Sequence, residues 1–232
     1  MKKEALNKCD CEKCDLKDIF YKSVEEDIIE LMCNTKVEKS FKTGEVIIEA
    51  GNPIESFTYL KSGLVKLFRP GGDEKGQIIM IAKPFDFVSL LSVFSDTSYN
   101  YSVTALEDSV TCNIKLDDIK KMIHTNGDFA MSIMKKMSSV SDMIILESLT
   151  LRRKHIHGRV AYILLFFADQ IYETDYFELP LSRKEIAEFI GKTTENVIRT
   201  LSEFRKDGLI KIFGKSIEIV DKEKLRKVSE LG

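Results

Sequence analysis

Residues 181–207 read LSRKEIAEFIGKTTENVIRTLSEFRKD, and this stretch decides how the rest of the chain is interpreted. Ile186, Ala187 and Ile190 recur at the spacing of an apolar helix face. Gly191 then suits a tight turn that a residue with a Cβ would resist. The first half of the stretch therefore predicts a short helix that ends in a turn.

A second helix is predicted directly after that turn. Thr193 can cap its first turn through the hydroxyl oxygen. Val197, Leu201 and Phe204 would form its buried face. Two short helices joined by a tight turn are a helix-turn-helix, in which the second helix enters the major groove of DNA.

The opposite face of the second helix carries side chains that can bond base edges or phosphates. These residues are Thr194, Glu195, Asn196 and Arg199. We interpret this helix as a candidate recognition helix. The alternative at this point is a plain helical hairpin inside a protein core.

Composition is typical of a globular protein of two modest domains. The 232 residues are 44% hydrophobic and 31% charged, with a formal net charge of -2. Residues 151–232 carry 16 Lys plus Arg against 13 Asp plus Glu, whereas residues 1–150 carry 19 against 24. A basic C-terminal part fits DNA binding weakly. With no apolar run of about 18 residues and no secretion signal, we expect a cytoplasmic protein that does not span a membrane.

Three cysteines gather in the polar N-terminal segment. Cys9, Cys11 and Cys14 lie within six residues, and a reducing cytoplasm argues against a disulfide framework. Thiolates bind zinc or iron–sulfur clusters, and Cys33 or Cys112 would supply a fourth ligand. Metal or cluster binding, redox chemistry and no function at all remain open for these thiols.

Short β-rich segments separated by glycines follow between residues 37 and 116. Many short strands at regular spacing predict an antiparallel roll or barrel. The interval from Gly44 to Gly63 resembles the start of a cyclic-nucleotide-binding roll. The segments 86–90 and 98–102, where such a roll would bind phosphate, contain no arginine. Because a buried cyclic phosphate needs a cation to offset its desolvation, we expect no cyclic AMP binding.

A long helix is predicted from about Asp128 to His155. An apolar stripe along it suggests dimerisation, with a single buried helix in a monomer as the alternative. The predicted interface consists of Ile133, Met137, Val140, Ile144 and Leu151. A second apolar set is expected to face the roll, and it consists of Met131, Met134, Ile145 and Leu149.

Residues beyond the helix-turn-helix predict a β-hairpin wing. Gly208-Leu209-Ile210 begins an alternating strand, and residues 217–220 form its partner. Lys215 lies at the tip, where it can contact a phosphate. Ser182 and Arg183 are also expected to hold phosphate. Residues 222–227 are interpreted as a solvated charged helix.

This order of elements resembles the family of bacterial transcription factors that contains the cyclic-AMP receptor protein and the fumarate–nitrate reductase regulator. The resemblance covers nearly the whole chain. It implies an α+β fold: an N-terminal cyclic-nucleotide-binding-like antiparallel β-roll, a long dimerisation helix and a C-terminal winged helix-turn-helix. The corresponding boundaries are a Cys-bearing segment at 1–36, a roll at 37–126, a helix and hinge at 127–156 and a DNA-binding domain at 157–232.

The resemblance also implies roles for individual residues. The family's recognition helix has a Glu and, four residues later, an Arg, which Glu195 and Arg199 match. A carboxylate can accept from cytosine N4, and Arg can pair with guanine O6 and N7. Lys192 and Ile198 depart from the family pattern, and Ile198 can contact a thymine methyl. The predicted DNA-binding set is Ser182, Arg183, Thr193, Thr194, Glu195, Asn196, Ile198, Arg199 and Lys215.

The oxygen-sensing branch of that family binds a [4Fe–4S] cluster through three N-terminal cysteines and one in the roll. Cys9, Cys11 and Cys14 lie N-terminal as its ligands do, although more tightly spaced, and Cys112 falls late in the roll. The resemblance therefore implies an iron–sulfur cluster as a possible cofactor on these four residues.

The leading hypothesis is a homodimeric regulator, not an enzyme, that binds double-stranded DNA at an inverted repeat. RNA polymerase becomes a partner if the regulator activates transcription. A signal at the roll or the cysteines would shift the spacing of two recognition helices. A cytoplasmic metal or redox enzyme and a ligand-binding module without DNA binding are the competing hypotheses. The sequence contains no paired carboxylates, Ser–His–Asp grouping or phosphate-binding glycine loop that would support an enzyme.

Overall fold

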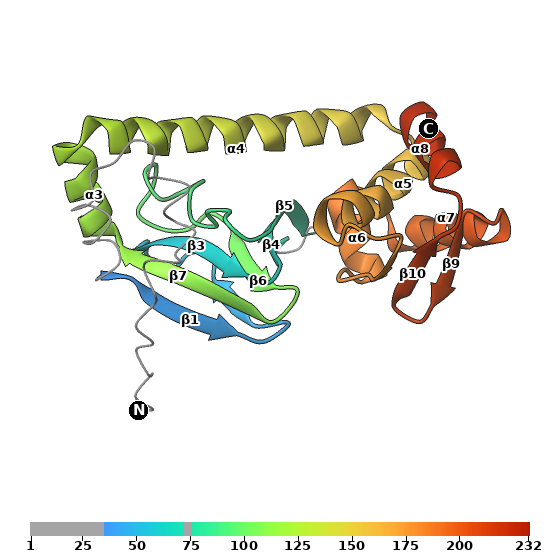
Figure 1. Ribbon diagram of the computed structural model, residues 1–232, viewed down its shortest axis with the longest axis horizontal. Helices are drawn as coiled ribbons and strands as arrows, with labels where there is room; N and C mark the ends of the chain where they lie inside the picture. The colour runs from blue at the N-terminus through green and yellow to red at the C-terminus, as the bar shows by residue number, and fades with distance from the viewer. Residues whose placement is uncertain (1–34, 72–75) are drawn as a thin grey trace. The chain divides into compact units, whose positions relative to one another are not determined.

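The computed structural model describes residues 35–71 and 76–232 (Figure 1). Contacts divide them into two units: residues 35–70 with 80–142, and residues 143–232 with 71 and 76–79. Each unit is described by itself. Almost all of the predicted Cys-bearing segment at 1–36 lies outside the described residues. The thiols of Cys9, Cys11, Cys14 and Cys33 lie outside them as well.

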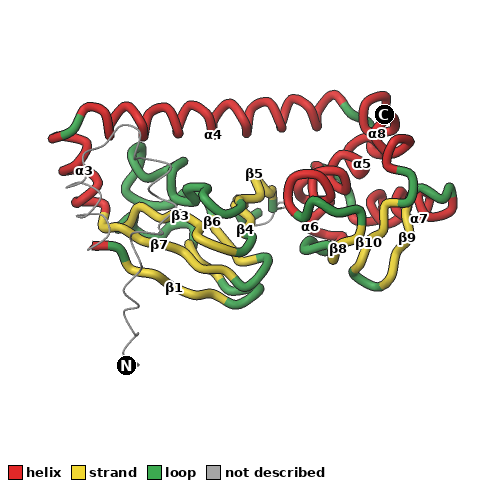
Figure 2. The backbone as a smooth tube through the Cα atoms, in the orientation of Figure 1, coloured by secondary structure: helices red, strands yellow, loops and turns green. Residues whose placement is uncertain are grey.

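The predicted roll consists of two sheets, whose strands are yellow in Figure 2 and include those labelled β1, β3, β4, β5, β6 and β7. The first sheet has the order β1-β7-β3 and the second the order β2-β6-β4-β5. Their bounds are β1 Val37–Phe41, β2 Val46–Ile48, β3 Ser56–Ser62, β4 Val65–Arg69, β5 Gln77–Ala82, β6 Ser102–Ala105 and β7 Ser109–Lys115. The α+β prediction is confirmed, and β1 is a strand that the sequence pattern did not reveal.

The core of the roll is apolar and aromatic because strand residues alternate between its two faces. Phe57 and Leu60 of β3 and Leu67 of β4 are fully buried. In the first sheet, β7 lies between its two partners, so Cys112 is opposite Glu38 on one side and Tyr59 on the other. This register determines what surrounds the Cys112 thiol.

Two helices follow the roll, α3 (Leu116–Thr125) and α4 (Gly127–Arg153). The bounds of α4 agree with the predicted long helix, but the second apolar set is about half exposed and does not pack against the roll as expected. Ile133, Val140 and Leu151 are buried within the single chain, whereas Met134 and Ile145 are more than half exposed. Met137 and Ile144 are half-buried. Both apolar sets have heptad-like spacing, so the sequence pattern does not distinguish them. Only the folded chain shows which set is buried.

The second unit contains the winged helix-turn-helix. Helix α5 begins at Ile156, so His157 belongs to its first turn. The elements are α5 (Ile156–Phe166), the π-helical η2 (Phe167–Ile171), β8 (Tyr176–Glu178), α6 (Arg183–Ile190), α7 (Thr194–Lys206), β9 (Ile210–Phe213), β10 (Ser216–Ile219) and α8 (Lys222–Leu231). The wing is a three-stranded sheet of order β8-β10-β9, with β8 added to the predicted hairpin.

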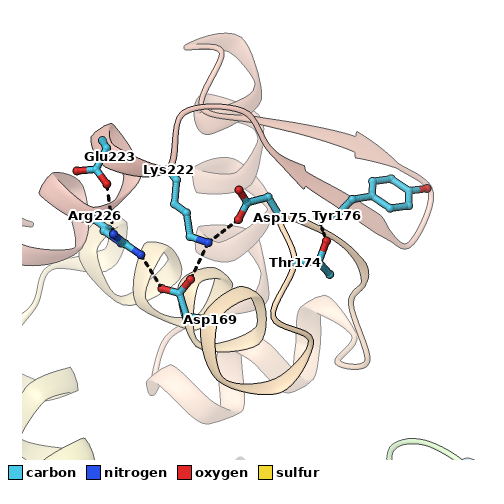
Figure 3. A network of polar contacts seen from close by, with 7 residues as sticks. All are labelled: Asp169, Thr174, Asp175, Tyr176, Lys222, Glu223 and Arg226. Atoms are coloured by element: carbon cyan, nitrogen blue, oxygen red, sulfur yellow. Dashed lines mark hydrogen bonds and ion pairs between the residues drawn. The ribbon is translucent and has the colours of Figure 1, made fainter.

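The C-terminal helix α8 is bound to the domain by charged side chains (Figure 3). Lys222 Nζ lies 2.7 Å from a carboxylate oxygen of Asp169 and 2.5 Å from one of Asp175. Arg226 lies 3.3 Å from the other Asp169 oxygen. Leu225 is fully buried. The expectation of a merely solvated helix was therefore incomplete, because one face of α8 belongs to the core.

Gly63 and Gly44 provide a matched test of the roll's turn geometry. Both have a positive φ, +90° and +86°, and a Cβ in that region costs about 1–2 kcal/mol. At Gly63 the added Cβ would also lie 2.6 Å from the Asp108 carbonyl oxygen, whereas at Gly44 nothing lies within 4 Å. Gly63→Ala should therefore lower the free energy of unfolding by roughly 1–3 kcal/mol more than Gly44→Ala. Denaturant unfolding followed by circular dichroism measures both, and equal losses would contradict the prediction.

Candidate nucleic-acid interface

Helix α6 begins with a capping box. Ser182 Oγ accepts from the Glu185 backbone N–H at 3.2 Å, and the Glu185 carboxylate accepts from the Ser182 N–H at 2.7 Å. Two backbone donors that the first helical turn leaves unpaired are thereby satisfied. The Ser182 hydroxyl proton remains available, so this residue can cap the helix and still donate to a phosphate.

The turn between α6 and α7 has the geometry that the sequence predicted. Gly191 adopts φ +66° and ψ +42°, and its N–H donates to Ala187 O. Thr193 caps α7 by accepting from the Asn196 N–H at 3.4 Å. A left-handed residue ends the first helix and a hydroxyl begins the second. These local devices set the angle at which α7 leaves α6.

Helix α7 divides cleanly into a buried and an exposed face. Val197, Leu201 and Phe204 are buried, as predicted. Glu195, Ile198 and Arg199 are exposed, and Thr194 and Asn196 are half-exposed. Ile198 is 50% exposed, so its apolar side chain lies on the surface without a core to join. A mixed face of this kind can read base edges and a thymine methyl.

Arg199 is held along the recognition helix by its neighbours. Its Nη2 donates to Asn196 Oδ1 at 3.0 Å, and its Nε lies 4.0 Å from Glu203 Oε1. Glu203 Oε2 in turn lies 2.6 Å from His157 Nε2 of α5. Glu203 lies four residues after Arg199, and this helical spacing could have identified it from the sequence as a partner of Arg199. Nothing local pointed to His157, because its partner is 46 residues away.

A groove of about 400 Å³ separates the start of α6 from the wing turn. Ser182, Arg183 and Lys215 all line it, so the three predicted phosphate contacts lie together. Partial burial lowers the pKa of the Arg183 guanidinium. Among residues 35–71 and 76–232, no ion pair to Arg183 is found, and the nearest carboxylate to Lys215 is that of Glu178 at 4.0 Å. Cationic donors at one opening suit a phosphate backbone.

The segment of the roll where a cyclic phosphate was considered has its polar groups occupied. Ser89 is buried, and its hydroxyl oxygen accepts from the Thr58 N–H at 2.8 Å. Tyr101 donates to Val88 O at 2.9 Å. The Phe57 and Phe87 rings pack with centroids 4.8 Å apart. Arg69, exposed at the end of β4, is the only arginine before residue 152.

Cys112 lies in a closed, acidic setting. Its side chain is fully buried, and the thiol donates to Glu38 Oε1 at 3.7 Å. Burial and, less strongly, the Glu38 carboxylate raise the pKa of this thiol to about 12. Lys61 pairs with the same carboxylate at 2.7 Å. In this arrangement the sulfur faces Glu38, so ligation of a cluster by Cys112 would require the Glu38 carboxylate to move away from the thiol.

Across the described ranges, no group of three or more His, Cys, Asp or Glu side chains is arranged to hold a metal ion. Within the same ranges, no helix has the length and apolar character needed to cross a membrane.

Comparison with family models covers most of the chain. Residues 158–228 match the model of the Crp-like helix-turn-helix domain, and residues 38–126 match that of the cyclic nucleotide-binding domain. The second match applies to a domain whose phosphate segment here contains no arginine.

Characterised relatives are similar along most of their length. Electron transport regulator A of Shewanella oneidensis is 28% identical over 194 residues, 81% of this chain and 76% of the relative. The transcriptional activator protein Anr of Pseudomonas aeruginosa is 26% identical over 227 residues, 95% and 93% of the two chains.

Solved structures share the fold. FixK2 from Bradyrhizobium japonicum aligns with a TM-score of 0.73 at 24% identity, covering 83% of this chain and 96% of that one. A CRP-family transcriptional regulator from Thermus thermophilus aligns with a TM-score of 0.72 at 19% identity, covering 83% and 96%.

Proposed function

Because the chain belongs to the CRP/FNR family of DNA-binding transcription regulators, which are not enzymes, we propose that it binds an inverted-repeat operator as a homodimer. The observation that carries this proposal is the exposed face of α7, where Arg199 stands beside Glu195 and Asn196 above a buried apolar face. One turn apart on one helix, Glu195 and Arg199 can contact neighbouring base pairs. Such a role places the protein in the cytoplasm.

The geometry supports separate roles for two groups of residues. Glu195 and Arg199 read bases, with Thr194, Asn196 and Ile198 beside them on the same face and Thr193 capping the helix that presents them. Ser182, Arg183 and Lys215 bind phosphate from the groove between α6 and the wing. Phosphate contacts position a protein on DNA, and base contacts specify the sequence.

Dimerisation, which is general in this family, is proposed to use the exposed stripe of α4. Met131, Met134, Ile145 and Leu149 are each between 46% and 55% exposed. They are separated by 3, 11 and 4 residues, each close to whole helical turns, so they share one face. An apolar stripe of this kind is stabilised when a second copy covers it. This face replaces the one that the sequence pattern favoured.

Several relatives bear names of transcriptional activators, so we propose RNA polymerase as the second partner. Cyclic AMP is not proposed as the signal, because the segments 86–90 and 98–102 of the roll contain no arginine and the hydroxyl groups of Ser89 and Tyr101 bond backbone groups of the roll. The remaining candidate site for a signal is the group of three cysteines, Cys9, Cys11 and Cys14, which lies outside the described residues. We propose it as a site for a soft metal ion or an iron–sulfur cluster without Cys112.

The base-reading role predicts a loss of sequence discrimination. With a duplex selected from random DNA by the unsubstituted protein, Glu195→Ala or Arg199→Ala should each weaken binding by about 1–3 kcal/mol. Binding to unrelated DNA should change little, because phosphate contacts supply that affinity. Gel-shift titrations on both duplexes measure the two effects.

Arg183→Gln is the matched control, since it removes a cation from the groove and no base contact. This variant should weaken binding to both duplexes alike and reduce the slope of log K against log salt concentration by about one. Equal losses on both duplexes for Arg199→Ala would contradict the base-reading role.

The interface proposal predicts that Ile145→Glu dissociates the dimer, because a carboxylate would be desolvated between two helices. Ser139→Glu adds the same charge at an exposed position about 120° around the helix and should leave the dimer intact. Sedimentation equilibrium over a range of protein concentrations distinguishes the two. A monomeric Ser139→Glu protein beside a dimeric Ile145→Glu protein would reverse the assignment.

The cysteine proposal predicts iron, zinc or sulfide in protein purified without oxygen. Metal content and visible absorbance should be lost when Cys9, Cys11 and Cys14 are replaced by Ser. Both should persist in Cys112→Ser, whose thiol faces Glu38 in this fold. Loss of metal and absorbance in Cys112→Ser would show that Glu38 moves away from the thiol and that Cys112 is a ligand. Unsubstituted protein that contains no metal would overturn the proposed metal site itself.

A further inference from the structure

Arg159 of α5 donates hydrogen bonds to the ends of two other helices. Its Nε donates to Lys154 O at 2.8 Å, directly after α4, and its Nη2 to Arg152 O at 3.4 Å in the last turn of that helix. Its Nη1 donates to Ile190 O at 2.7 Å, the last residue of α6. One guanidinium thus joins the end of the long helix to the first helix of the helix-turn-helix.

The chemistry of these contacts explains why an arginine serves here. The last carbonyls of a helix have no partner within it, and they carry the negative end of the helix dipole. A guanidinium offers a planar fork of donors, so it can satisfy carbonyls in different directions at once. A lysine has a single nitrogen and could bridge fewer of them in fixed geometry.

A second contact joins the same two helices. The Tyr162 hydroxyl, one turn further along α5, donates to Glu147 Oε1 of α4 at 3.2 Å. The Arg159 contacts lie at the end of α4, and the Tyr162 contact lies more than one turn before it. Two separated attachments restrict rotation of α5 against the end of α4, whereas a single contact would act as a pivot.

The connection from α5 reaches the recognition helix through Ile190. This residue ends α6, and only Gly191, Lys192 and Thr193 separate it from α7. A displacement of the Ile190 carbonyl therefore moves the start of α7. The direction of the recognition helix relative to the end of α4 depends on the Arg159 bridge.

We propose that Arg159 is a positioning residue that sets the distance between the two recognition helices of the dimer, and so the half-site spacing the protein accepts. The proposal rests on the proposed function, because it requires a dimer joined through α4 and bound to two half-sites. Arg159 need not touch DNA in this role.

The experiment uses the full-length protein and a ladder of operators. The duplexes carry the selected half-site twice, with the separation varied one base pair at a time around the preferred value. The unsubstituted protein should bind the preferred spacing most tightly, since a dimer matches half-sites about one helical turn apart. Arg159→Gln should reduce this preference on the order of tenfold, as the loss of charge-assisted hydrogen bonds implies. Arg159→Lys should retain part of it.

Arg153→Gln is the matched control. It removes the same charge from the end of α4, and the Arg153 side chain is exposed and forms no part of the bridge. Its spacing preference should equal that of the unsubstituted protein. If circular dichroism shows that Arg159→Gln no longer unfolds cooperatively, binding to the operator ladder is measured with Arg159→Lys instead.

Three outcomes separate the possibilities. An unchanged ladder in Arg159→Gln would overturn the positioning role. A uniform loss of affinity at every spacing would also overturn it, because general destabilisation lowers all values alike. If the unsubstituted protein shows no preference for a repeated half-site, the proposed function itself fails, and this is seen before any variant is made.

Discussion

The burial of one face of α7 is the interaction on which the rest of the DNA-binding unit depends. Val197, Leu201 and Phe204 pack into the core, and this packing leaves Glu195 and Arg199 pointing away from it. A helix of 13 residues is marginal by itself in water, so tertiary packing of the apolar face supplies most of its stability. The polar face can then be composed for recognition and need not contribute to the core.

In the roll of the first unit, too, the residues that build the fold are separate from ligand-binding chemistry. The roll has the architecture of a nucleotide-binding domain, but its interior is filled by side chains such as Phe57, Tyr59 and Phe87. Ser89 and Tyr101 lie in the segments where a ligand was considered, and their hydroxyl groups bond the backbone of the roll. Fold and ligand are separable, because a domain keeps its strands while its binding segment changes chemistry.

Arg159 and Tyr162 connect the end of α4 to the DNA-binding elements within the second unit. Both lie on α5, and both bond the end of α4, while Arg159 also reaches α6. Helix α8 packs against α5, and Lys154, between α4 and α5, donates to Ser229 O of α8. The last turns of α4 therefore belong to the same compact unit as the DNA-binding elements, and these contacts are the route by which we propose that the end of α4 positions the recognition helix.

Local patterns by themselves determined most strands of the roll, the long helix, the hairpin of the wing and the two helices around Gly191. Periodicity, caps and turn residues act over a few positions, so a single sequence displays them. The candidate DNA-reading residues could be predicted for the same reason. Long-range contacts decided the rest: which apolar stripe of α4 is covered, that Glu38 faces Cys112, and that Arg159 meets Ile190. Those pairs are separated by dozens of residues, and only the folded chain brings them together, because burial depends on neighbours that no local pattern names.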